Sequence, residues 1–197
     1  MKLFSAAAER NKAPFAQVLK TVLPETGLVL EIAGGTGQHA AFMSAQFPNL
    51  QWQPAERHER ELASMHMYRE ESGLENFLTP VQIDVFDQPW AVEQADAMVC
   101  MNMIHISPWD ATLKLLDGAS RALSTGAPLC LYGPYRRKDQ PTAESNEGFD
   151  QSLKSRDPSW GLRYLEDVSS EAKERGFELT LIQPMPANNL TVVFTRN

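Results

Sequence analysis

Three glycines follow an apolar run near the start of the chain. The run 28–33 leads directly into Gly34-Gly35-Thr36-Gly37, and residues 38–47 have the pattern of a helix. Glycine lets the backbone approach a ligand closely, and the free N–H groups and dipole of a following helix attract negative groups such as carboxylates. Three glycines in four positions exceed what turning the chain requires, so we expect a ligand-binding turn at the carboxyl end of a buried strand.

Acidic residues near neighbouring strand ends narrow the choice of ligand. The G-x-G-x-x-A spacing that begins at Gly35 also satisfies the relaxed dinucleotide pattern. Glu56, just past the second predicted strand, suits hydrogen bonds to ribose hydroxyls in either an NAD enzyme or a methyltransferase. Glu31 could cap the following turn, and Asp84, after the third strand, could form an Asx turn. NAD enzymes do not generally need either acid, so the pair favours a methyltransferase.

Over nearly its whole length, the sequence resembles the class I S-adenosylmethionine-dependent methyltransferases. The matching parts are Glu31 to Gly37, Glu56, Asp84 and Ala95 to His105. More narrowly, the chain resembles a small methyltransferase-like family of unassigned substrate, through Glu9 to Lys12, Gly34 to His39 and Pro186 to Leu190. The resemblance implies S-adenosylmethionine as cofactor and S-adenosylhomocysteine as product.

The resemblance also assigns parts of the cofactor to residues. Gly35 and Gly37 would flank the methionine part, Glu56 would bind the ribose, and Asp84 would approach the adenine amino group. Ala33 stands where many members of the superfamily carry glycine, which narrows the expected pocket. The expected cofactor-binding residues are Glu31, Ala33, Gly34, Gly35, Thr36, Gly37, Glu56, Arg57, Asp84, Val85, Asn102 and Met103.

Candidates for the chemical step follow the fourth and fifth predicted strands. His105 lies just beyond the fourth, and histidine is the side chain whose ordinary pKa is closest to neutrality, so it is a candidate base or substrate ligand. The polar segment 133–157 is long for a compact domain, and it is either a substrate loop or a surface excursion. Tyr135 and Asp150 are its catalytic candidates. The candidate acceptor-binding residues are Arg10, Asn11, Tyr132, Asn146 and Phe149.

Two further side chains receive mainly structural interpretations. His39, in the helix after the glycines, is interpreted as a satisfied surface or boundary group. Trp160, beyond segment 133–157, is assigned to core or rim packing, with stacking on a cofactor as the less favoured alternative.

Short apolar runs alternate with longer amphipathic ones, and this alternation predicts an α/β fold. The expected architecture is a Rossmann-like, doubly wound, mostly parallel seven-stranded sheet with helices on both faces. The six residues between the last two strands are too few for a helical crossover, so these strands should form a C-terminal antiparallel hairpin. The predicted strands are 28–33, 50–54, 78–84, 95–101, 127–132, 177–183 and 190–195, and the main predicted helices are 12–22, 38–47, 59–72, 108–123 and 164–175.

Length and composition limit the class of protein. The chain has 197 residues, of which 43% are hydrophobic, so we expect one domain over 1–197, with an N-terminal cap and helix in 1–25. A net charge of −7 disfavours nucleic acid as a partner and leaves a small-molecule substrate. No stretch has the apolar length of a membrane span or signal peptide, so we expect no membrane and a cytoplasmic location. Cys100 and Cys130 lack metal-site spacing and are interpreted as reduced core thiols, and no metal is expected.

Methyl transfer from a sulfonium is an in-line displacement, in which the protein mainly positions the two reactants. The sequence leaves the acceptor atom open. Two other classes stay open as well. One is a cofactor-binding or partner-regulating protein without activity. The other is an NAD(P)-dependent oxidoreductase, although the chain lacks the Tyr-x-x-x-Lys pair of the short-chain type.

Overall fold

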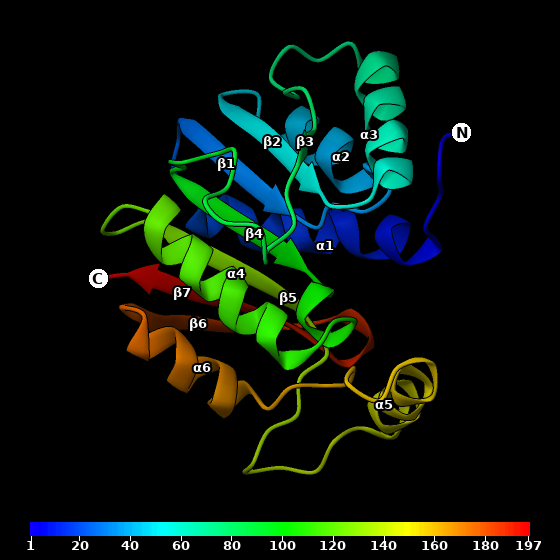
Figure 1. Cartoon of the computed structure of the whole chain (residues 1–197), viewed down its shortest axis with the longest axis vertical. Coiled ribbons are helices and arrows are strands. Elements are labelled where there is room, and N and C mark those ends of the chain that lie inside the picture. The colour runs from blue at the N-terminus through cyan, green and yellow to red at the C-terminus, as the bar shows by residue number, and fades with distance from the viewer.

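A computed structural model describes residues 1–197, which fold around one seven-stranded sheet (Figure 1). The strand order is β3-β2-β1-β4-β5-β7-β6. The strands are β1 (Gly27–Ile32), β2 (Leu50–Glu56), β3 (Val81–Gln82), β4 (Ala97–Met101), β5 (Pro128–Gly133), β6 (Phe177–Met185) and β7 (Asn189–Arg196). The helices are α1 (Ala6–Val22), α2 (Gln38–Gln46), α3 (Glu59–Ser72), α4 (Trp109–Ala122), α5 (Glu144–Arg156) and α6 (Leu165–Glu174), with short 3-10 turns at Met103–His105 and Pro186–Asn188.

The first five strands pair in parallel, and β7 runs antiparallel to both β5 and β6. This confirms the doubly wound α/β sheet and the C-terminal hairpin. The turn between β6 and β7 is tight, with Ala187 and Asn188 both at positive φ. Because β6 runs parallel to β5, this turn lies at the same sheet edge as the glycines that follow β1.

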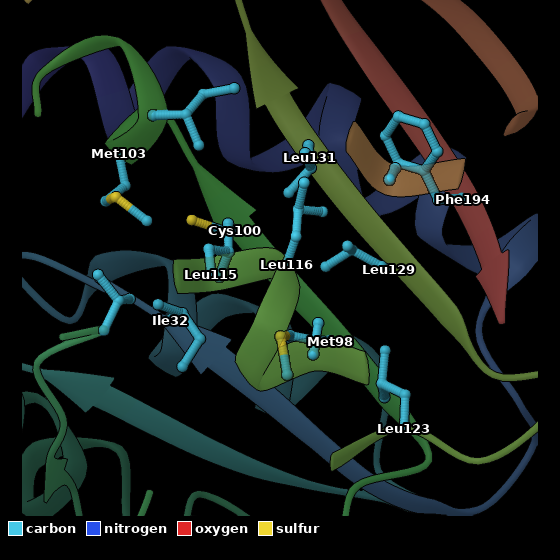
Figure 2. Close-up of a cluster of buried hydrophobic side chains, with 14 of the residues drawn as sticks. Ile32, Met98, Cys100, Met103, Leu115, Leu116, Leu123, Leu129, Leu131 and Phe194 are labelled. Carbon is cyan, nitrogen blue, oxygen red and sulfur yellow. The ribbon is translucent and has the colours of Figure 1, made fainter. Parts of the chain in front are cut away.

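Helices cover both faces of the sheet, so the chain has two apolar cores. On one face, α4 and α6 pack on the sheet, and Figure 2 shows Leu115 and Leu116 of α4 against side chains from β4 and β5. On the other face, Phe15 and Leu19 of α1 pack with Met43 of α2. α5 lies apart, beyond the carboxyl edge (Figure 1). No helix is both long and apolar enough to cross a membrane.

Two element predictions were wrong in extent. The predicted strand 78–84 forms ladder pairs only at Val81 and Gln82, because Pro80 lacks an N–H group and Asp84 begins a turn. The first helix starts at Ala6 rather than residue 12. Ser5 caps it by accepting a hydrogen bond from the Ala8 N–H at 3.3 Å. Pro14 therefore lies inside the helix, not in its first turn.

The segment 133–157 is not one loop, since most of its second half is α5. The first turn of α5 holds the acidic residues Glu144 and Glu147, and its last turn holds the basic residues Lys154 and Arg156. This distribution matches the helix dipole. Leu153, on the inner face of α5, is fully buried. The helix was missed because its apolar face is too narrow to give a helical periodicity.

Candidate functional site

A pocket of about 300 Å³ opens at the carboxyl edge of β1, β2, β3 and β4. Parallel strands bring their carboxyl ends to one edge, so residues far apart in sequence meet there. Seven of the residues expected to bind a cofactor line this pocket: Ala33, Gly35, Glu56, Arg57, Asp84, Val85 and Met103. The other expected residues, Glu31, Gly34, Thr36, Gly37 and Asn102, are not among its lining residues.

Glu56 ends β2 and lines this pocket although its side chain is largely buried. Its Oε2 accepts a hydrogen bond from the Gly35 N–H at 3.1 Å, and its Oε1 accepts hydrogen bonds from the N–H groups of Arg57 at 2.8 Å and His58 at 3.4 Å. A carboxylate can accept about four hydrogen bonds, so these three backbone donors orient it and leave capacity at Oε2 for a ligand hydroxyl.

The glycines of the turn have different tasks. A Cβ on Gly35 would meet nothing within 4 Å, and the φ of this residue is +60°, so it combines open space with a left-handed backbone. A Cβ on Gly37 would lie 2.9 Å from Met65 Cα, so this glycine allows α3 to pack against the turn. Ala33 has a φ of +55°. This explains why glycine is the more favourable residue there, because a side chain at that φ is strained.

Glu31 lies beneath the turn and is almost completely buried. Its Oε2 accepts a hydrogen bond from Trp52 Nε1 at 2.7 Å. Burial raises the pKa of Glu31 to about 7, against the opposing effect of the Trp52 hydrogen bond, and the nearby Glu56 adds to the increase. The pair Glu31 and Trp52 therefore supports the glycine turn from inside the protein.

Asp84 forms the Asx turn considered for it and also lies at the pocket wall. Its Oδ1 accepts a hydrogen bond from the Phe86 N–H at 3.0 Å, which is an Asx turn. Its Oδ2 lies 3.7 Å from Nη1 of Arg57, and the residue also lines the pocket. The turn thus holds the carboxylate at the pocket wall.

His105 lies in the 3-10 turn after β4, and its ring is completely buried. It packs edge-on against Tyr135 with ring centroids 5.0 Å apart, and neither ring nitrogen has a hydrogen-bond partner. Burial, together with the positive charge of Arg163, lowers the pKa of His105 to about 3, so the ring is neutral. A Cβ on Gly133 would lie 2.5 Å from His105 Nε2, so glycine is required there. Neither His105 nor Tyr135 lines the 300 Å³ pocket.

Asp150 belongs to a network of ion pairs on α5. Its Oδ2 accepts hydrogen bonds from Arg136 at 3.0 Å and Lys154 at 2.6 Å, and its Oδ1 accepts one from the Leu162 N–H at 2.8 Å. These hydrogen bonds together outweigh burial and lower the pKa of Asp150. Asp150 therefore joins α5 to the segment that follows it, and it lies outside the pocket lining.

The expected acceptor-binding residues separate into two groups. Asn11 accepts a hydrogen bond at Oδ1 from His39 Nε2 at 2.7 Å, and the Asn11 side chain also hydrogen-bonds Tyr132. Burial lowers the pKa of His39 to about 4, so the ring is neutral and can donate through only one nitrogen. Asn146 instead donates to the Asn188 carbonyl at 2.9 Å, close to the hairpin turn.

Two expected acceptor residues are exposed, and two relevant residues were missed. Arg10 is exposed, and Phe149 is 39% exposed on α5. His39 joins the group of Asn11 and Tyr132, a partnership that no sequence spacing indicates. Trp160 lines the pocket, although the sequence favoured packing over a ligand contact for it. Its position after a Pro-containing turn carried no signal of this role.

One family model matches almost the whole chain. It covers residues 2–196 and is described as a protein of unknown function, DUF938. This description assigns no reaction to its members.

Solved structures share the fold at low sequence identity. Mitomycin 7-O-methyltransferase MmcR has a TM-score of 0.82 at 18% identity, and the match covers 98% of this chain and 56% of that one. An O-methyltransferase family 2 protein from Planctomyces limnophilus, in complex with apigenin, has a TM-score of 0.79 at 16% identity, with 97% and 61% covered. CalO1, a methyltransferase in calicheamicin biosynthesis in its S-adenosylhomocysteine-bound form, has a TM-score of 0.73 at 14% identity, with 96% and 55% covered. The chain therefore has the class I methyltransferase fold and spans little more than half the length of these structures.

Proposed function

Because the chain belongs to the DUF938 family of proteins of unknown function and has the class I methyltransferase fold, we propose that it is an S-adenosylmethionine-dependent methyltransferase. The acceptor in this proposal is a small molecule. One observation carries it: the carboxylate of Glu56 faces a pocket beside the Gly35 backbone, with Asp84 at the next strand end of the same pocket. A nucleoside needs this arrangement, with one acid for ribose hydroxyls and another group for the base edge.

The residues present fit this cofactor. Gly35 offers open space where a side chain would otherwise stand, and Glu56 keeps acceptor capacity at Oε2 beyond its three backbone hydrogen bonds. Gly35, Glu56 and Asp84 would hold the methionine part, the ribose and the adenine edge respectively. Val85 and Met103 would supply apolar contacts. When bound, the cofactor supplies a methyl group on a positively charged sulfur.

His105 is our candidate base for an acceptor that carries a proton. Its ring is neutral, so one nitrogen carries a proton and the other, which has no partner, could accept one. Because the ring is buried, this role requires the Met103–His105 turn to open when the acceptor binds. Tyr135 would act through its edge-on contact with His105, and Asp150 through the segment that it anchors.

Asn11 and Tyr132 are our candidates for positioning the acceptor, together with the exposed Arg10. The Asn11 side chain hydrogen-bonds Tyr132, which lies near the end of β5. The Tyr132 ring packs edge-on against Phe15 on the face of the sheet that α1 covers, so an acceptor held by these residues would approach the pocket from that face. Asn146 and Phe149 lie on α5 and would shape the outer part of such a site.

A second candidate function rests on the burial of the catalytic candidates. His105, Tyr135 and Asp150 are all buried, and none lines the pocket. This favours a protein that binds the cofactor and regulates a partner without turnover. Assay of methyl transfer to a panel of small hydroxyl, amine and thiol compounds separates the two functions.

The test of cofactor choice is a thermal melt with S-adenosylhomocysteine and, separately, with NADH. At a hundred times the dissociation constant, linkage stabilises by about 2.7 kcal/mol, which raises the Tm by about 5 to 10 °C at this size. We expect that increase with S-adenosylhomocysteine alone. A melt raised only by NADH would support an oxidoreductase and refute the proposal.

Glu56→Ala tests the observation that carries the proposal. Hydrogen bonds to a charged group contribute about 1.5 to 3 kcal/mol, so calorimetry should show S-adenosylhomocysteine affinity about tenfold to a hundredfold lower. Glu25→Ala removes an exposed glutamate and is the matched control. Equal affinity in the Glu56 and Glu25 variants would show that Glu56 does not contact the ribose.

A further inference from the structure

The segment 157–163, between α5 and α6, contributes one side chain to the 300 Å³ pocket. That side chain is the indole of Trp160. All other lining residues come from the ends of β1, β2, β3 and β4 or from the first turns of the helices that follow β2 and β4. Trp160 is therefore the only residue from beyond β5 that lines this pocket. It is not among the residues assigned to the cofactor above.

The backbone around Trp160 is held on both sides. The Trp160 N–H donates to the Asp157 carbonyl at 3.0 Å, and the Gly161 N–H donates to the His105 carbonyl at 2.9 Å. The Leu162 N–H donates to Asp150 Oδ1 at 2.8 Å. The indole is thus presented by a pinned segment, which lowers the entropy lost when a ligand orders it.

Arg163 ties the same segment to the pocket wall. Its Nε donates to the Ile104 carbonyl at 2.9 Å. Its Nη2 donates to the carbonyls of Ser107 at 2.6 Å and Ser159 at 3.0 Å. Ser107 lines the pocket, so this one guanidinium places the residue before Trp160 next to the start of α4.

The walls near Trp160 suit a flat apolar ring. Residues that follow β3, namely Val85 and Phe86, line the same pocket as Ala111 of α4 and Trp160. The guanidinium of Arg156 lies 5.4 Å from the centroid of the Trp160 ring, which covers one face of the indole. Trp160 also lines the pocket, and aromatic rings attract flat π systems in offset stacks.

We propose that Trp160 is a cofactor-binding residue whose indole covers the purine ring of S-adenosylmethionine. This inference rests on the proposed function. It assigns segment 157–163 to the cofactor side of the pocket. It also gives Asp150 and Arg163 a positioning role, since both act on the ligand only through this segment.

The test compares Trp160→Ala and Trp160→Phe with the unmodified chain by calorimetry, using S-adenosylhomocysteine and adenosine as probes. Loss of a ring that stacks on a base should weaken both probes by about tenfold to a hundredfold in Trp160→Ala. Trp160→Phe keeps a stacking ring and should remain within about threefold of the unmodified chain. Tyr164→Ala, which removes an exposed aromatic residue just before α6 and outside the pocket lining, is the matched control and should bind normally.

A fluorescence measurement keeps the inference testable if Trp160→Ala fails to fold. Stacking of the purine on Trp160 should quench tryptophan emission when S-adenosylhomocysteine is added, and the quenching should be lost in Trp160→Phe. If the unmodified chain binds both probes but Trp160→Ala binds them equally well, Trp160 does not contact the purine and only this inference fails. If the unmodified chain binds neither probe, the proposed function fails together with it.

Discussion

Glu31 should make the stability of this protein fall as the pH rises through the slightly acidic range. Its carboxyl is buried under the glycine turn, where desolvation raises the pKa from 4.5 to about 7. The unfolded chain ionises this group near pH 4.5, whereas the folded chain keeps it protonated up to about pH 7. Its contribution is therefore fully present below pH 4.5 and is lost progressively as the pH rises to 7.

The magnitude follows from the size of this pKa increase. Raising the pKa of one group from 4.5 to about 7 corresponds to about 3 kcal/mol, since one pH unit of difference is about 1.4 kcal/mol. Glu31→Gln removes the titration and keeps an oxygen that can accept the hydrogen bond from Trp52 Nε1. We therefore expect the variant to match the parent near pH 4.5 and to exceed it by about 3 kcal/mol at pH 8.

The assay is urea unfolding of both proteins at four pH values between 4.5 and 8. The difference in free energy of unfolding between variant and parent should grow with pH and level off above pH 7. Glu25→Gln, at an exposed glutamate, is the control and should show no such growth. A constant difference for Glu31→Gln, or one that shrinks as the pH rises, would refute the reasoning.

Two further predictions concern packing and a buried histidine. Gly118→Ala in α4 should destabilise the fold by about 1 to 3 kcal/mol in urea unfolding, because its Cβ would lie 2.0 Å from the Trp90 ring. Gly148→Ala in α5, where a Cβ meets nothing within 4 Å, should instead stabilise the fold by up to about 1 kcal/mol. Equal effects of the two substitutions would contradict the close packing of Gly118 against Trp90. Asn11→Asp should raise the pKa of His39 from about 4, because it places a carboxylate beside Nε2. An NMR titration of the imidazole measures this, and a midpoint near 6.5 in the parent would show that His39 is not buried as described.

Local sequence determined the parts of the site that each strand end carries by itself. Gly34 to Gly37 form the predicted turn, and Glu56 and Asp84 line the predicted pocket. These positions could be predicted because apolar runs mark strands, and the carboxyl ends of parallel strands meet at one edge. The hairpin followed from the length of its connection. By contrast, α5 and the early start of α1 rest on capping and a narrow buried stripe, and these signals are weak in a single sequence.

Contacts between distant segments were decided only by the tertiary structure. Asn11 and His39 are partners because α1 packs against α2, and no spacing in the chain encodes that approach. His105 has the residue type and position of a base, yet its burial depends on Gly133 and Tyr135 from another strand and loop. Trp160 reaches the pocket because backbone hydrogen bonds pin its segment to the turn after β4. The sequence alone thus specified which chemistry stands at each strand end. Packing set which side chains are neutral, buried or within reach, because desolvation and contact depend on neighbours that are remote along the chain.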